Sequence, residues 1–134
     1  MNKVPMNNNQ KLNIPGYSGM ERRRNVRVSP ITEGEIVLTM DGSEYLVSDI
    51  SEGGVSFWIP ESDAAAMAFT NGAALKLYIQ LPNAEKPFPV IVSVLARMPN
   101  GLVRSSFKKA HKESMLLVKQ YVVIRVQESV GVYF

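Results

Sequence analysis

The feature that most constrains the fold of this chain is a strict alternation of apolar and polar residues in short stretches. The clearest stretch is LKLYIQL at residues 75–81, where every second residue is leucine or isoleucine. Successive side chains of a β-strand point to opposite faces of its sheet, so one face of this segment is apolar. The pattern therefore predicts a strand with one face in a hydrophobic core.

Five further stretches have strand character, and turn signals such as DGSE at 41–44 and PNG at 99–101 separate neighbouring stretches. They are EIVLTM (35–40), YLVSDIS (45–51), VSFWI (55–59), FPVIVSVLARM (88–98) and LVRSSF (102–107). Within residues 45–51, alternation places Tyr45 and Asp49 on one face and Ile50 on the other. Six short strands separated by turns are typical of a mainly-β domain, either an antiparallel barrel or a sandwich.

Two segments predict helices rather than strands. ESDAAAMAF, residues 61–69, predicts a short helix. The stretch from about 111 to 127 is rich in valine, but its length and the spacing of Leu117, Tyr121 and Ile124 favour a C-terminal α-helix. The first 20 residues contain many Asn, Pro and Gly residues without apolar periodicity. We therefore expect a flexible arm at 1–20 and a single domain at 21–134.

The residue types present argue against several functional classes. The chain has no cysteine and one histidine, His111, which argues against a disulfide framework, a zinc site and a Ser–His–Asp triad. No phosphate-binding loop is present, so we do not expect an enzyme. No apolar run is long enough to span a bilayer or to act as a signal peptide. We therefore expect a cytoplasmic protein without membrane insertion.

The net charge of +3 is unevenly distributed along the chain. Residues 1–30 contain six basic residues and one acidic residue, residues 31–103 three basic and nine acidic, and residues 104–134 six basic and two acidic. General nucleic-acid binding favours a continuous basic surface, so the acidic middle argues against DNA or RNA as a partner. A local arginine cluster suits a small, compact anion instead.

The arginine cluster is ERRRNVR, residues 21–27, in which Arg22, Arg23 and Arg27 form the pattern RRxxxR. Arg24 lies within this pattern. A planar guanidinium binds phosphate oxygens through two parallel N–H groups. Taken alone, such a cluster is most often a solvated surface patch.

The second motif is DISEGG, residues 49–54, with the pattern DxSxxG. Asp49 and Ser51 are two residues apart on a predicted strand, so they project from the same face. A carboxylate can accept hydrogen bonds from N1 and N2 of guanine, whose O6 and N7 are usual partners of arginine. Gly53 and Gly54 free the backbone to turn and let a ligand approach. Alone, this motif predicts a hairpin turn with a capping aspartate; the two motifs together predict a site for a guanine nucleotide.

In this order and at this spacing, the two motifs make residues 21 to about 127 resemble the PilZ domain family, bacterial receptors for cyclic di-GMP. The resemblance implies a six-stranded antiparallel β-barrel with a helix across one end. The site residues that it implies are Arg22, Arg23, Arg27, Asp49, Ser51, Gly53 and Gly54. In the family the arginines wrap the phosphates and contact the guanines, the aspartate and serine contact a guanine edge, and the glycines shape the turn.

The chain departs from the family pattern in its last strand, where many members have a glycine three residues before a phenylalanine. Here that position is Arg104, in RSSF. The function that we expect is binding of cyclic di-GMP, without another cofactor, and signalling to a downstream protein through ordering of the N-terminal arm. The alternative is a protein-interaction domain whose arginine cluster meets an acidic partner surface without binding a nucleotide.

Overall fold

The computed structural model describes residues 26–60 and 69–130. The predicted arm at 1–20 lies outside the described residues, as do Arg22, Arg23 and Arg24. The segment 61–68, which contains nearly all of the predicted short helix, also lies outside them.

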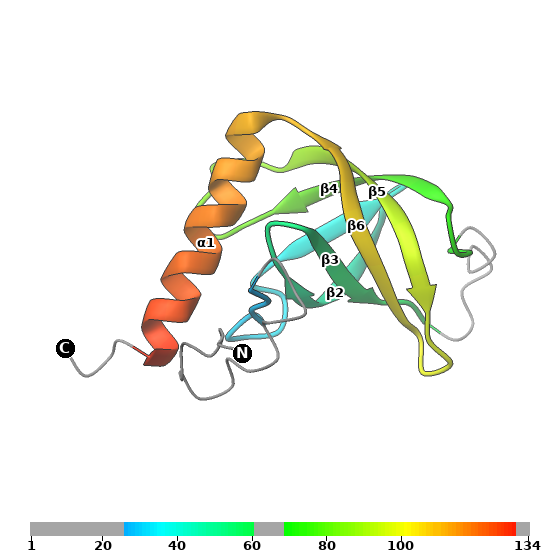
Figure 1. The fold of residues 1–134 in the computed structure, drawn as a ribbon, viewed down its shortest axis with the longest axis horizontal. Helices are drawn as coiled ribbons and strands as arrows, with labels where there is room; N and C mark the ends of the chain where they lie inside the picture. Colours follow the sequence, from blue (N-terminus) through cyan, green and yellow to red (C-terminus); the bar gives the residue numbers. More distant parts are fainter. Residues whose placement is uncertain (1–25, 61–68, 131–134) are drawn as a thin grey trace, which may run out of the picture.

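The described residues form a closed β-barrel followed by one helix. The strands are β1 (Val37–Met40), β2 (Ser43–Ile50), β3 (Gly54–Trp58), β4 (Ala74–Gln80), β5 (Phe88–Arg97) and β6 (Leu102–Ala110), and the helix is α1 (Lys112–Val130). All pairs are antiparallel, in the order β1-β2-β3-β6-β5-β4, and β1 pairs with β4 to close the barrel (Figure 1). The predictions of six antiparallel strands and a C-terminal helix are confirmed, and the architecture is a barrel rather than a sandwich.

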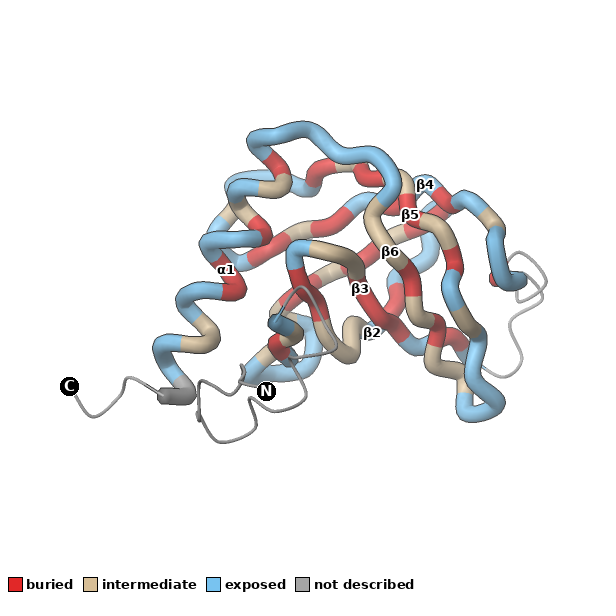
Figure 2. Tube along the Cα trace, viewed as in Figure 1, coloured by how far each residue is buried: buried red, intermediate tan, exposed pale blue. Residues whose placement is uncertain are grey.

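The interior of the barrel is the hydrophobic core. Strand β4 alternates between exposed and buried residues, as LKLYIQL predicts, and β1 and most of β5 alternate between buried and more exposed residues in the same way (Figure 2). The rings of Tyr45, Phe57 and Phe69 pack against one another with centroids 5.8 to 5.9 Å apart. Tilted and edge-on ring contacts of this kind stabilise a core beyond the area that they bury.

The prediction for residues 45–51 is wrong in one respect, because β2 contains a β-bulge. Strict alternation would place Tyr45 and Ile50 on opposite faces, but both are buried in the core. The register of the β2–β3 pair shifts between Val47 and Asp49, which exchanges the inward and outward positions along the strand. The bulge therefore turns Asp49 and Ser51 to the outer face of the barrel, although Tyr45 points inward.

Helix α1 packs beside one end of the barrel (Figure 1) and buries Val118 and Tyr121 in the core cluster. The Tyr121 hydroxyl donates a hydrogen bond to Glu35 at 2.5 Å. Arg125 donates from Nε and Nη2 to the carbonyl oxygen of Ser29 at 3.1 and 2.9 Å. The helix thus holds the segment between the arginine motif and β1. Within the described part of the chain, no helix is long and apolar enough to cross a membrane.

Candidate ligand-binding site

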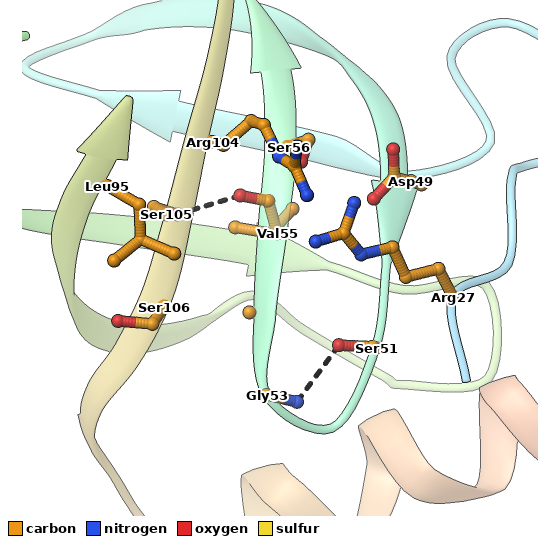
Figure 3. Close-up of a pocket in the computed structure, with 11 residues that line it drawn as sticks. Arg27, Asp49, Ser51, Gly53, Val55, Ser56, Leu95, Arg104, Ser105 and Ser106 are labelled. Carbon is orange, nitrogen blue, oxygen red and sulfur yellow. Dashed lines mark hydrogen bonds between the residues drawn. The ribbon is translucent and has the colours of Figure 1, made fainter. Parts of the chain in front are cut away.

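A cavity of about 250 Å³ lies on the outer face of the barrel wall, over β2, β3 and β6 (Figure 3). Among the residues that line it are Arg27, Asp49, Ser51, Gly53 and Gly54. These are all of the predicted site residues that fall within 26–60 and 69–130. The structure therefore brings the end of the arginine motif and the whole of the DxSxxG motif to one place.

Arg27 is positioned by a short backbone bridge between the two motifs. The N–H of Val28 donates to the carbonyl of Ile50, and the N–H of Ile50 donates to the carbonyl of Val28, both at 2.9 Å. Residues that flank an antiparallel pair also lie opposite each other, so Arg27 lies beside Ser51. Figure 3 shows the half-buried side chain of Arg27 extending from the side of β2 toward β3, with its guanidinium between the two strands.

Asp49, Ser56 and Arg104 form one row across three neighbouring strands. Asp49 of β2 pairs with Ser56 of β3, and Ser56 pairs with Arg104 of β6. Residues directly opposite each other project from the same face of a sheet. Ser56 is only 4% exposed and forms the floor, with Asp49 and Arg104 on either side of it. Ser48 Oγ donates to Asp49 Oδ2 at 3.2 Å, which leaves the carboxylate further acceptor positions.

The turn between β2 and β3 is held by hydrogen bonds within the DxSxxG motif. Ser51 Oγ accepts from the N–H of Gly53 at 3.0 Å, and the N–H of Ser51 donates to the carbonyl of Gly54 at 2.9 Å. The carbonyl of Gly53 accepts from the N–H of Phe107 at 2.8 Å, which ties the turn to β6. The Ser51 hydroxyl thus shapes the turn, and its own proton can still be donated to a ligand.

The requirement for glycine at position 54 comes from strand packing. A Cβ atom at Gly54 would lie 2.0 Å from the carbonyl oxygen of Ser105 and 2.9 Å from Cα of Ser106. The backbone of β6 therefore approaches too closely for any side chain. The expectation that Gly54 shapes a turn is incomplete, because Gly54 begins β3 and has no positive φ.

Arg104 and Leu95 also line the cavity but were not among the predicted site residues. The guanidinium of Arg104 extends over β3 from β6, on the side opposite to Arg27 (Figure 3). Its position in the same row as Asp49 depends on the pairing of β3 with β6, which the local sequence RSSF does not reveal. The sequence signal that points to Arg104 is that it stands where many members of the family have glycine. Leu95 is exposed at a bulge in β5.

The described part of the cavity combines charges of both signs. Arg27 and Arg104 contribute two guanidinium groups, and Asp49 contributes a carboxylate. Such a lining suits a ligand that carries both anionic oxygens and N–H donors. Among the described residues, no group of three or more His, Cys, Asp or Glu side chains is placed to hold a metal ion.

A closed antiparallel barrel whose outer wall carries a cavity with arginine, aspartate and serine side chains defines a small ligand-binding β-barrel domain. A family model described as the PilZ domain matches residues 21–123, and the chain belongs to this family. A search of the curated proteins gave no significant match.

Solved structures share this fold at low sequence identity. The Bacillus subtilis inhibitor of motility, MotI/DgrA, has a TM-score of 0.64 and 19% identity over 81% of this chain and 53% of its own. The MrkH–c-di-GMP complex of K. pneumoniae has a TM-score of 0.60 and 16% identity, over 81% of this chain and 54% of MrkH. The PilZ domain of Escherichia coli YcgR with c-di-GMP has a TM-score of 0.58 and 13% identity, over 81% of this chain and 94% of the YcgR domain. The chain thus spans about half of the first two proteins and nearly all of the third.

Proposed function

We propose that this chain is a receptor for cyclic di-GMP and acts by binding this ligand, without catalysis. The observation that carries the proposal is the convergence of two motifs, because Arg27 and the DxSxxG residues line one cavity on the barrel wall. Membership of the PilZ family supports the proposal, as do the c-di-GMP complexes of MrkH and YcgR, which have the same fold.

The phosphates of cyclic di-GMP are assigned to the arginine motif. Arg27 extends over the cavity, where its guanidinium can donate two parallel hydrogen bonds to a phosphate. Arg22 and Arg23 precede it by five and four residues. An extended chain covers about 3.5 Å per residue, so both side chains are connected closely enough to reach the same ligand.

One guanine is assigned to the DxSxxG motif. The Asp49 carboxylate lies on the outer face with acceptor positions remaining, and guanine offers adjacent donors at N1 and N2. Ser51 can donate its hydroxyl proton to a neighbouring acceptor of the ligand. Gly53 keeps the turn free of a side chain beside the bound base, and Gly54 lets the backbones of β3 and β6 lie close together under it.

We further propose that binding orders residues 1–27 and thereby creates a surface for a downstream protein. The support is the composition of this segment, which is rich in Asn, Pro and Gly without apolar periodicity and clusters arginines that repel one another. Ligand phosphates would neutralise this repulsion. Residues that follow are already anchored, since Val28 pairs with Ile50 and Arg125 binds the carbonyl of Ser29.

Calorimetric titration with cyclic di-GMP tests the proposal, with GTP and single-stranded RNA as controls. We expect saturable binding of cyclic di-GMP and much weaker binding of GTP. RNA binding that falls steeply with salt, without a preference for guanine, would instead indicate a nucleic-acid binder. Absence of binding to all three would reject the receptor and leave the protein-interaction alternative.

A further inference from the structure

Arg104 and Asp49 occupy opposite ends of the row that crosses β2, β3 and β6, with Ser56 between them. Neighbouring strands are about 4.8 Å apart, so the backbones of Asp49 and Arg104 are separated by roughly 10 Å. Ser56 has a small side chain and is buried at the floor of the row. The row therefore has a carboxylate acceptor at one end and a five-donor guanidinium that reaches over β3 from the other, and the guanidinium of Arg27 lies beside both in the same cavity (Figure 3).

The guanidinium of Arg104 is available to a ligand. Arg104 is half-buried and lines the cavity, and no residue of the described segments forms a hydrogen bond or ion pair with its side chain. Figure 3 shows Arg104 turned over β3 toward Arg27 and Asp49.

A guanine base matches both ends of this row. Its N1 and N2 carry hydrogen-bond donors, which suit the Asp49 carboxylate, and its O6 and N7 are acceptors on the adjoining edge, which arginine binds in bidentate fashion. We infer that Arg104 is a specificity-determining residue that reads O6 and N7 of the guanine whose N1 and N2 are bound by Asp49. This inference rests on the proposed function and goes beyond the two motifs, because Arg104 belongs to neither of them.

An alternative contact for Arg104 is a ligand phosphate, shared with Arg27. The two contacts differ in their dependence on the base. A phosphate contact is indifferent to N7 of guanine, whereas a bidentate contact to O6 and N7 loses one charge-assisted hydrogen bond when N7 is replaced by carbon. The 7-deazaguanine analogue of cyclic di-GMP makes this replacement and keeps N1, N2, O6 and both phosphates.

The experiment measures the affinities of cyclic di-GMP and its 7-deazaguanine analogue for the wild type, Arg104→Met and Lys108→Met. Lys108 is the matched control, because it is a cation on the same strand that is exposed and does not line the cavity. We expect the wild type and Lys108→Met to prefer cyclic di-GMP by roughly tenfold. Arg104→Met should bind cyclic di-GMP roughly 10- to 100-fold more weakly than the wild type and show no preference between the two ligands.

Three results would overturn the inference. If Arg104→Met binds like Lys108→Met, Arg104 makes no contact, and the proposed function survives. If Arg104→Met lowers the affinity for both ligands equally and keeps the wild-type preference for cyclic di-GMP, the contact is to phosphate and not to the base. If the wild type binds neither ligand, the proposed function fails and the inference fails with it. Thermal unfolding of each variant, and Arg104→Gln as a second substitution, separate lost contact from lost fold.

Discussion

Val28 and Ile50 exchange two backbone hydrogen bonds of 2.9 Å, and this pair joins the two motifs of the candidate site. Val28 follows Arg27 directly, and Ile50 lies between Asp49 and Ser51. Both Val28 and Ile50 are buried, so the bridge is part of the core as well as of the site. An isolated pair thus determines where the arginine motif meets the barrel wall.

Arg27→Ala should remove most of the affinity for cyclic di-GMP and leave the fold intact, because the side chain extends over the outer face of the barrel. A lost charge-assisted contact costs about 2 kcal/mol or more, equivalent to roughly thirtyfold in affinity. The same loss is expected for Arg23→Ala. Calorimetry measures it, with Lys119→Ala on the exposed side of α1 as a control of equal charge change. Wild-type affinity in both arginine variants would refute the phosphate assignment.

Asp49→Ala should weaken cyclic di-GMP binding and reduce discrimination against cyclic di-AMP. Adenine has no N1–H, so the carboxylate favours guanine through N1 and N2. Competition titrations with both dinucleotides measure the ratio of the two affinities. Glu44→Ala is the matched control, because Glu44 is an exposed carboxylate at the other end of β2. An unchanged ratio in Asp49→Ala would show that Asp49 does not read the base.

Gly54→Ala should destabilise the barrel, because the added Cβ would lie 2.0 Å from the carbonyl oxygen of Ser105. Overpacking of this kind costs about 1–3 kcal/mol and occasionally more. Gly34→Ala is the comparison, since no atom lies within 4 Å of its Cβ position and only its φ of +88° opposes the substitution, at about 1 kcal/mol. Urea unfolding measures the loss of stability in each variant. A loss for Gly54→Ala that is equal to or smaller than the loss for Gly34→Ala would contradict the packing argument.

Tyr121→Phe should destabilise the junction between α1 and the segment before β1. The substitution removes the donor to Glu35, and an unsatisfied partly buried acceptor costs about 1–3 kcal/mol. Tyr78→Phe is the control, because Tyr78 is 41% exposed on β4. Equal unfolding free energies for the two variants would show that the Tyr121–Glu35 hydrogen bond contributes nothing.

The raised pKa of Tyr121 predicts that the free energy of unfolding depends on pH in the alkaline range. Burial raises the pKa of Tyr121 above its ordinary value. The hydrogen bond to Glu35 and the negative charge of Glu35 raise this pKa further. A group with a raised pKa in the folded state contributes stability below its unfolded pKa, here about 10, and loses it as the pH rises further. The free energy of unfolding should therefore fall above pH 10 in the wild type and fall less in Tyr121→Phe. Identical alkaline slopes would rule out this contribution.

Hydrogen exchange tests the proposed ordering of the arm. Amides across residues 1–27 should exchange fast without ligand, and cyclic di-GMP should protect residues 22–27 and 49–54. Residues 75–81 lie in a paired core strand and should change little. Deletion of residues 1–20 should alter affinity less than Arg27→Ala. An arginine segment that is protected without ligand, or unprotected at saturation, would reject the switch.

Local sequence was sufficient for the parts of this protein that depend on neighbours along the chain. Alternation in residues 75–81 predicted β4, because strand side chains alternate whatever the partner strand is. Length and spacing predicted α1 despite its valines, and the helix spans Lys112–Val130. The DxSxxG motif also shapes its own turn through Ser51 and Gly53, which are two residues apart.

Only the tertiary structure decided what lies on which side of the barrel wall. The bulge between Val47 and Asp49 has no signature in the residues themselves, yet it turns Asp49 outward after an inward Tyr45. The pairing of β3 with β6 brings Arg104 into the row of Asp49, although 55 positions separate them in the sequence. Alternation defines faces within one strand, whereas register and strand order arise from packing the whole core, so the sequence determined the elements and the closed barrel determined the site.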